Sequence, residues 1–253
     1  MSVYSSPNNL ALFLGRVLPF GLAMFCFAPS GLRRAGAGAL TAIVLIALAL
    51  TQSLGAALLG VPAAVACVLL LWDWRRGGAI LLSLAALALI GLPVAAQIPR
   101  LQGALDLSRA SSLMRAQLWQ ASLNLLAERP LTGAGLDQFL YLYRSRYILP
   151  SAWEEPDLSH PHNILLDFWI RLGLGGVIVL GALQLAFWRK GLRAWRQLRG
   201  DRLMAACVVG ALGAMANILA HGLVDNSYFV IDLAYIFCFT VAIVNGAHSG
   251  HNA

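Results

Sequence analysis

The sequence predicts an all-α membrane protein with about seven transmembrane helices and a large helical loop between the fourth and the fifth. Of its 253 residues, 59% are hydrophobic and 11% are charged, whereas soluble domains carry about 25% charged residues. Apolar runs of about 20 residues, long enough to cross about 30 Å of hydrocarbon, recur along the chain. These runs are continuous, which favours helices over the alternating strands of a membrane barrel.

The predicted spans follow from the positions of these runs. No basic segment or small-residue cleavage site marks the first run as a removable signal, so we expect it to remain as a helix. A tight turn near Gln52 separates the second span from the third, and residues 98–162 form the large loop. All spans are expected to belong to a single domain, residues 1–253, and lie at about 9–28, 35–51, 55–72, 78–97, 163–187, 203–222 and 228–246.

Basic residues divide the connections between the spans into two sets. Three groups of them fall on alternate connections: Arg33 and Arg34, Arg75 and Arg76, and the block from Arg189 to Arg202. Because cytoplasmic loops retain Lys and Arg, we expect these connections to face the cytoplasm. The N-terminus and the 98–162 loop then face the other side, and the C-terminus faces the cytoplasm. Since the +7 charge is spread between apolar runs, it argues against binding of nucleic acid.

The 98–162 loop is too long to lack secondary structure of its own. Ser108 or Ser111 could cap a helix that reaches Glu128 and is stopped by Pro130. The stretch PLTGAG is then a turn, and LDQFLYLYRSRYI reads as an aromatic-rich amphipathic helix at the membrane interface.

Three arginines of this loop could bind an anion: Arg115, Arg144 and Arg146. Arg115 lies four residues before Trp119, so the two share one face of the first loop helix. Guanidinium groups match phosphate oxygens in geometry, and several arginines beside a histidine would suit an anionic phosphate. Solvated or headgroup-bound arginine is the alternative for each of them.

Two histidines lie where the loop returns to the membrane, in LSHPHNILLDFWIRLGLGG. One interpretation of His160 and His162 is a helix start, with Pro161 near the first turn and Ser159 or Asn163 as the cap. That interpretation does not account for a pair of histidines. The other makes one imidazole a general base, because histidine titrates near pH 7.

Charged and titratable groups also lie within or beside the predicted spans. Asp167 and Arg171 are four residues apart and share a helix face, where they either form a structural ion pair or line a cavity. Arg16 has no local partner, so it either snorkels to the outer surface or serves a site. His221 and Asp225, in the outer connection HGLVDN, could approach the same cavity as the histidines or form a polar helix end.

Taken in order and spacing, three stretches of the sequence resemble the C-terminal half of the O-antigen ligase family. They are MRAQLWQASLNLLAERPLTGAGLDQF, HPHNILLDFWIRLGLGG and HGLVDNSYFVIDLAYIF. SPNNLALFL and TQSLGAALLG further resemble the family's Pro-Asn helix and Ser-Arg-Gly helix, so the resemblance covers nearly the whole chain. The superfamily also includes O-antigen polymerases and O-linked oligosaccharyltransferases.

The resemblance implies an inverting glycosyltransferase of the bacterial inner membrane, whose large loop is periplasmic. It implies transfer of a glycan from undecaprenyl pyrophosphate to lipid A core, another glycan or a protein hydroxyl, with no cofactor and no metal. By position, Arg115 would bind the pyrophosphate and His162 would be the base, with His160 as the other candidate. The remaining polar residues are expected to contact substrate: Arg16, Arg144, Arg146, Asn163, Asp167, Arg171, His221 and Asp225.

The sequence departs from the family pattern in two respects. Leu54 stands between Ser53 and Gly55, where the family has an arginine that Arg16 is the candidate to replace. The chain is also shorter than is usual in the family, so a partner chain that supplies further N-terminal helices is one expectation. The alternative to a transferase is a non-catalytic or truncated protein that binds or carries a polyprenyl-linked glycan. A carrier would place polar groups near the midplane, and their crowding toward the outer surface favours the enzyme.

Overall fold

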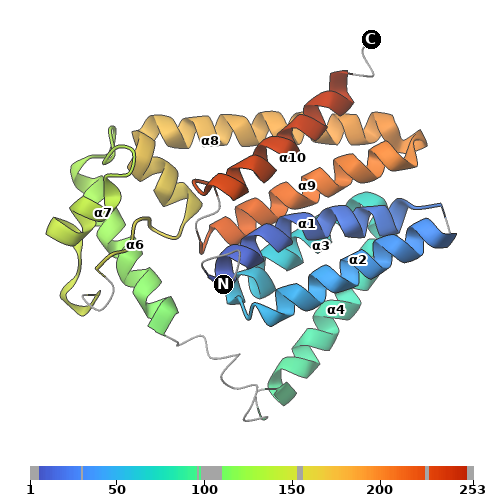
Figure 1. Cartoon of the computed structure of the whole chain (residues 1–253), viewed down its shortest axis with the longest axis horizontal. Helices are drawn as coiled ribbons and strands as arrows, with labels where there is room; N and C mark the ends of the chain where they lie inside the picture. Colours follow the sequence, from blue (N-terminus) through green and yellow to red (C-terminus); the bar gives the residue numbers. More distant parts are fainter. Residues whose placement is uncertain are drawn as a thin grey trace. The chain divides into compact units, whose positions relative to one another are not determined.

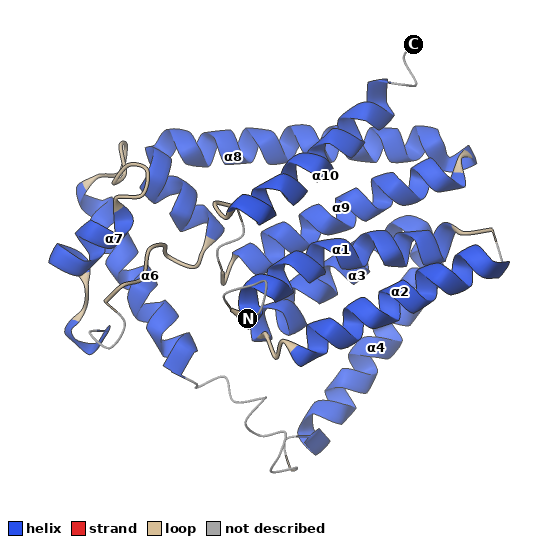
Figure 2. Cartoon of the chain, viewed as in Figure 1, coloured by secondary structure: helices blue, strands red, loops and turns tan. Residues whose placement is uncertain are grey.

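Helices make up all the regular secondary structure in the part of the chain that the computed structural model describes (Figure 2). That part comprises residues 6–29, 31–95, 97, 110–152, 156–225 and 228–249. Within it the predicted all-α fold is confirmed. The chain forms two compact units, which we describe separately: unit 1 contains residues 1–106, 187–221 and 231–253, and unit 2 contains 107–186 and 222–230.

Unit 1 is built from apolar helices (Figure 1). A π-helical turn, Ala56–Gly60, precedes one of them, and the bend at Gln52 confirms the predicted tight turn. The end of α8 (Ile164–Gln197) also belongs to this unit. Its other helices are α1 (Pro7–Phe27), α2 (Gly31–Leu50), α3 (Val61–Trp72), α4 (Trp74–Ala95), α9 (Arg202–Gly222) and α10 (Ile231–Ser249).

The helix lengths support a multi-pass membrane protein. Two shorter apolar helices, Ala56–Trp72 and Ile231–Ala247, lie where the third and seventh spans were expected, so the count of seven spans stays a prediction. Five helices among the described residues are long and apolar enough to cross a membrane: Pro7–Phe27, Gly31–Leu50, Trp74–Gly91, Ile164–Gly200 and Arg202–Gly222.

Small residues let the helices of unit 1 pack closely around α9. Of the candidate spans α9 is the most enclosed, with 67% of its apolar window buried. A Cβ atom on Gly213 would lie 2.7 Å from Cβ of Pro19 and 2.8 Å from Cγ2 of Val68, so these positions leave no room for a side chain. Close approach of this kind is how membrane helices gain dispersion energy, because lipid offers no hydrophobic driving force between them.

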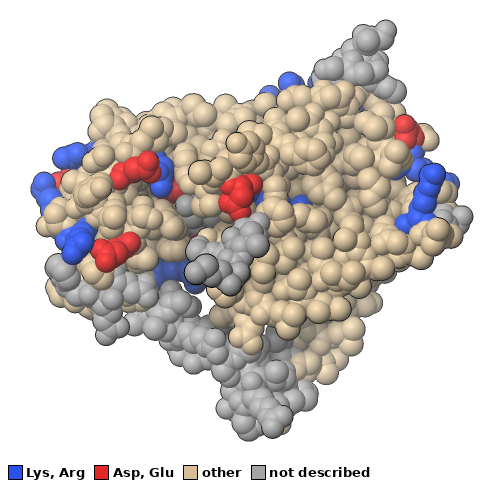
Figure 3. All heavy atoms as spheres, in the orientation of Figure 1, with Lys and Arg blue, Asp and Glu red and all other residues tan. Residues whose placement is uncertain are grey.

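The three basic connections meet at one end of unit 1. Arg33 and Arg202 line one pocket, Arg75 and Arg199 line a second, and Phe27 lines both. Figure 3 shows blue atoms gathered at the right-hand end of the view, beside the connections of α1 to α2 and of α8 to α9, while the helix faces between are largely tan. This common position is what the charge rule requires. The assignment of that end to the cytoplasm stays a prediction.

Unit 2 holds the predicted loop helices. The first is α6 (Ala110–Glu128), which ends at the predicted residue, while the proposed cap Ser108 lies outside the described residues. The second is α7 (Phe139–Leu142), continued by the π-helical turn Tyr143–Tyr147. Phe139, Tyr143 and Tyr147 are buried, whereas Tyr141 is 68% exposed, so the position of this segment at a membrane interface stays a prediction. The core of the unit comprises Leu118, Ala121, Leu125, Leu126, Phe139, Tyr143, Tyr147 and Ile170.

A kink in α8 joins that helix to the PLTGAG turn. Gly173 has φ 67° and ψ −163°, which breaks the helix and leaves the carbonyl of Ile170 and the N–H of Leu174 without their helical partners. The turn supplies a replacement partner for each group: Ala134 N donates to Ile170 O at 2.7 Å, and Leu174 N donates to Leu131 O at 3.1 Å. A Cβ on Gly173 would collide with the carbonyl of Leu131, so only glycine fits.

Candidate functional site

A histidine and a carboxylate form a pair in unit 2. Nδ1 of His162 lies 2.7 Å from Oδ1 of Asp225, whose residue is only 4% exposed. A carboxylate oxygen accepts, so the imidazole donates through Nδ1, and in a neutral imidazole with this tautomer Nε2 is the acceptor. His162 also has a left-handed backbone (φ 48°), uncommon for a residue other than glycine. An oriented imidazole with an open nitrogen can serve as a general base.

His160 lies beside this pair in a different electrostatic state. Its ring centroid is 4.2 Å from that of His162, and its Nδ1 is 3.0 Å from Oγ of Ser159. Burial and then the neighbouring His162 lower the pKa of His160 to about 4. His160 is therefore neutral at pH 7 and a weak base. Of the two predicted histidines, His162 has the carboxylate partner that a base needs.

Asn163 fixes the start of α8. Its Oδ1 accepts from the N–H groups of Leu165 at 3.0 Å and Leu166 at 3.1 Å, so its predicted role as helix cap is confirmed. Its Nδ2 donates to Leu223 O at 3.0 Å, which ties the histidine segment to the segment that carries Asp225. Pro161 lies two residues before the cap, near the first turn as predicted. A helix start and an oriented base are thus compatible.

Trp119 connects α6 to the histidines. Its Nε1 donates to the carbonyl of Pro161, between His160 and His162, at 2.9 Å. Arg115 lies one helical turn earlier on the same face, about 6 Å away between Cβ atoms. Among the described residues, Nε of Arg115 is buried without a hydrogen-bond partner. The Arg-x-x-x-Trp spacing therefore places an incompletely satisfied guanidinium close to the histidine segment.

The predicted pair of Asp167 and Arg171 is confirmed and extended. Nε of Arg171 donates to Oδ1 of Asp167 at 2.8 Å, and Nη1 donates to Asp137, a partner that the sequence did not reveal. The guanidinium also lies over the ring of Phe229, 4.7 Å from its centroid. Because Arg171 faces two carboxylates, its charge is compensated within the unit, and its predicted contact with substrate stays a prediction.

The other two loop arginines pair with exposed carboxylates. Arg144 lies 3.0 Å from Asp157, and Arg146 lies 2.8 Å from Glu128. Exposed pairs of this kind exchange readily, because each contributes only about 0–1 kcal/mol. The predicted contacts of both arginines with substrate are therefore neither supported nor contradicted by these pairs.

Two predicted residues, Arg16 and His221, belong to unit 1, so their approach to the histidine pair stays a prediction. Arg16 is fully buried, and its Nη1 donates to Leu233 O at 2.8 Å. Snorkelling of Arg16 to the surface was therefore a wrong expectation. Asn217, which the sequence analysis missed, lies one turn before the buried His221 on α9 and packs against Gly15. The sequence signal that could have identified Asn217 is a single amide side chain within an apolar run.

The histidine pair could also hold a cation. The ligand atoms of His160, His162 and Asp225 lie within 4.8 Å of one another. Two imidazoles and a carboxylate form a recurrent ligand set for divalent transition metals. The expectation that no metal is needed stays a prediction, and an experiment with a chelator decides it.

Comparison with known proteins identifies the family. The sequence profile of the O-antigen ligase family matches residues 39–181, more than half of the chain. The matched range includes Arg115, both histidines, the PLTGAG turn and the kink at Gly173. No curated protein matches the chain at a significant level.

Proposed function

Because the chain belongs to the O-antigen ligase family, we propose that it is a membrane glycosyltransferase of lipopolysaccharide or other surface-polysaccharide biosynthesis. Its donor is a glycan on undecaprenyl pyrophosphate, and its acceptor is a hydroxyl of lipid A core, of another glycan or of a protein. The chain lies in the bacterial inner membrane with its N-terminus and the 98–162 loop in the periplasm. The gathering of basic connections at one end of unit 1 supports this orientation.

The observation that carries the proposal is the bond between His162 and Asp225. Nε2 of His162 takes the proton of the acceptor hydroxyl as the hydroxyl oxygen attacks the anomeric carbon. Asp225 keeps the tautomer with the proton on Nδ1 and stabilises the imidazolium that forms, as the carboxylate does in hydrolytic triads. General base catalysis of this kind contributes about 10²–10⁴-fold in rate.

The departing group requires positive charge. As the new glycosidic bond forms, the bond from the anomeric carbon to the pyrophosphate oxygen breaks and its electrons pass to the diphosphate. Arg115 stabilises that charge. Its Nε has no hydrogen-bond partner among the described residues, and Trp119 ties the same face of α6 to the histidine segment. Attack from the face opposite the departing diphosphate inverts the anomeric centre. The protons and electron pairs of these reaction steps balance without a metal or cofactor.

In this proposal the remaining polar residues position the reacting groups. Asn163 holds the histidine segment on α8, and Asp167 and Arg171 brace the helix below it. Arg16 of unit 1 is the candidate for the arginine that Leu54 replaces in the family pattern, and a substrate contact of His221 stays a prediction. Arg144 and Arg146 exchange their exposed carboxylate partners for phosphate or glycan hydroxyls.

The test is transfer in vitro from a defined undecaprenyl-pyrophosphate glycan to candidate acceptors by the purified, reconstituted chain. We expect His162→Ala to lower the transfer rate about 10²–10⁴-fold and Arg115→Ala about 10²–10³-fold. The matched control is Arg129→Ala, an exposed arginine with no role in the proposal, and it should have a small effect. Wild-type rates in the His162 variant would refute the proposed base. Donor binding without transfer by the wild-type chain, alone and with a partner chain, would instead favour the non-catalytic alternative.

A further inference from the structure

A pocket lies at the basic end of unit 1, and none of the residues that line it has a role in the proposed mechanism. Its volume is about 510 Å³. We name it the tryptophan pocket, because three tryptophans and two arginines line it together with Phe27: Trp72, Trp74, Trp195, Arg75 and Arg199. These residues come from the end of α1, the connection of α3 to α4, the end of α8 and the 3₁₀ turn Leu198–Gly200 that follows it. The proposed function does not account for this combination of tryptophan and arginine side chains.

The two arginines of the tryptophan pocket keep their charge available. Arg75 lies over the ring of Trp74 at 5.3 Å, and Arg199 lies over the ring of Trp195 at 4.5 Å. Within the described residues neither forms an ion pair with a carboxylate. The acid that lines the pocket, Asp73, is occupied: its Oδ1 accepts the N–H groups of Arg75 and Arg76, and its Oδ2 lies 3.7 Å from Nε of Arg76.

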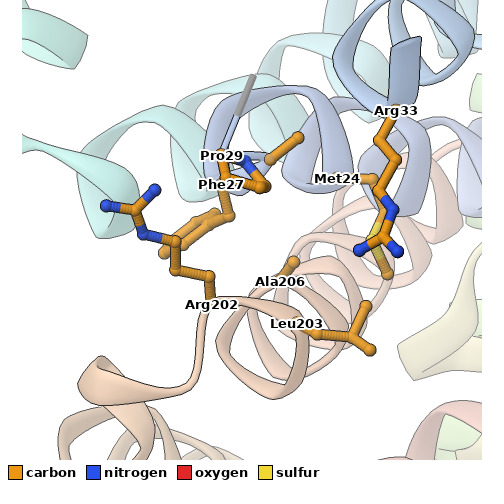
Figure 4. A pocket seen from close by; sticks show the side chains of 8 residues that line it. Met24, Phe27, Pro29, Arg33, Arg202, Leu203 and Ala206 are labelled. Atoms are coloured by element: carbon orange, nitrogen blue, oxygen red, sulfur yellow. The ribbon is translucent and has the colours of Figure 1, made fainter. Parts of the chain in front are cut away.

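A second, smaller pocket adjoins the first at Phe27, with a volume of about 110 Å³. Figure 4 shows the side chains of Arg33 and Arg202 on either side of an apolar surface formed by Met24, Phe27 and Leu203. The second pocket thus repeats the pattern of the tryptophan pocket, with two arginines from different connections beside apolar side chains.

We propose that the tryptophan pocket binds the headgroup of an anionic phospholipid. Tryptophan and arginine together are typical of the depth where lipid headgroups meet the acyl chains. The phosphate lies between Arg75 and Arg199, and the acyl chains run along the exposed Leu70 of α3. Basic pockets between helices on the cytoplasmic side of a membrane bind such headgroups through charge and hydrogen bonds. A soluble phosphate would gain nothing from the apolar lining.

The experiment is native mass spectrometry of the full chain in detergent, titrated with phosphatidylglycerol or with phosphatidylcholine of the same acyl length. The test variant is Arg75→Ala/Arg199→Ala. The matched control, Arg193→Ala/Arg196→Ala, removes the same charge from exposed positions of α8 outside the pocket lining. Arg75→Lys/Arg199→Lys retains the charge and, with a thermal melt, separates loss of binding from loss of fold.

We expect wild-type protein to retain phosphatidylglycerol in preference to phosphatidylcholine. Each pocket arginine is expected to contribute about five-fold in affinity, so the double alanine variant loses about 25-fold, whereas the control variant and the lysine variant change by less than about five-fold. Equal losses in the test and control variants would overturn the proposal, since they would indicate attraction by net charge alone. Displacement of the lipid by equimolar inorganic phosphate would also overturn it, because the site would then be a simple anion site.

Discussion

Different kinds of contact stabilise the interiors of unit 1 and unit 2. Unit 1 packs small residues closely around α9, and its helices meet through positions such as Gly213 where no side chain fits. Unit 2 is tied by side-chain hydrogen bonds and ion pairs, among them those of His162, Asn163 and Arg171. The difference indicates that close helix packing dominates unit 1, whereas polar side-chain contacts join the elements of unit 2. The predictions below test this contrast, from the largest expected effect to the smallest.

The ion pair on α8 should dominate the stability of unit 2. Arg171→Met leaves the buried Asp167 without its partner, and breaking a buried pair costs about 3–5 kcal/mol. We expect the free energy of unfolding, measured by titration with a denaturing detergent, to fall by that amount. The double variant Arg171→Met/Asp167→Leu replaces both charges by apolar groups and should recover most of the loss. A double variant as unstable as the single one would contradict a role for the unpaired charge.

The kink of α8 gives the next effect. Gly173→Ala forces a side chain into a left-handed position against the carbonyl of Leu131, and backbone strain alone costs about 1–3 kcal/mol. Gly175, two residues further, has open space around it, so Gly175→Ala should leave the helix unchanged or stabilise it by up to about 1 kcal/mol. Thermal melts of the two variants compare these sites directly. Similar melting temperatures would show that the kink is dispensable.

The pH dependence of stability should carry the signature of His160. Its pKa in the folded chain is about 4, below the ordinary 6.5, because burial and His162 disfavour the charged form. As the pH falls from 6.5 to 4, the unfolded chain takes up a proton that the folded chain does not, so stability is lost across this window. His160→Gln should show a smaller fall in melting temperature over the same range. Parallel curves for the two proteins would contradict the neutral, buried imidazole.

The smallest effect is expected for the buried amide of unit 1. Both polar atoms of the Asn217 side chain lack a hydrogen-bond partner within the described residues, and an unsatisfied amide costs about 1–3 kcal/mol. Asn217→Leu keeps the shape and removes that cost, so we expect unchanged or higher thermal stability. A large loss of stability would break the contrast between the units, because it would reveal a polar contact that holds unit 1 together.

Local spacing explains which features could be predicted from the sequence. The i,i+4 relation of Asp167 and Arg171, the cap at Asn163 and the end of α6 at Glu128 depend on neighbouring residues, and all three are found. The bond of Arg171 to Asp137 joins separate elements, so no periodicity reveals it. The burial of Arg16 likewise depends on how other helices surround it. The roles assigned to the site residues stay predictions.

The replacement of helical hydrogen bonds at Gly173 by bonds to the PLTGAG turn couples two segments that are distant in the sequence. Inside lipid an unpaired carbonyl or N–H costs several kcal/mol. Bending of α8 is therefore unfavourable until the backbone groups of Leu131 and Ala134 are in place to form the replacement hydrogen bonds. Bending of α8 and docking of the PLTGAG turn are therefore one cooperative step. A nascent α8 would insert straight, and the geometry around its polar residues would be completed last, when the loop folds down onto it.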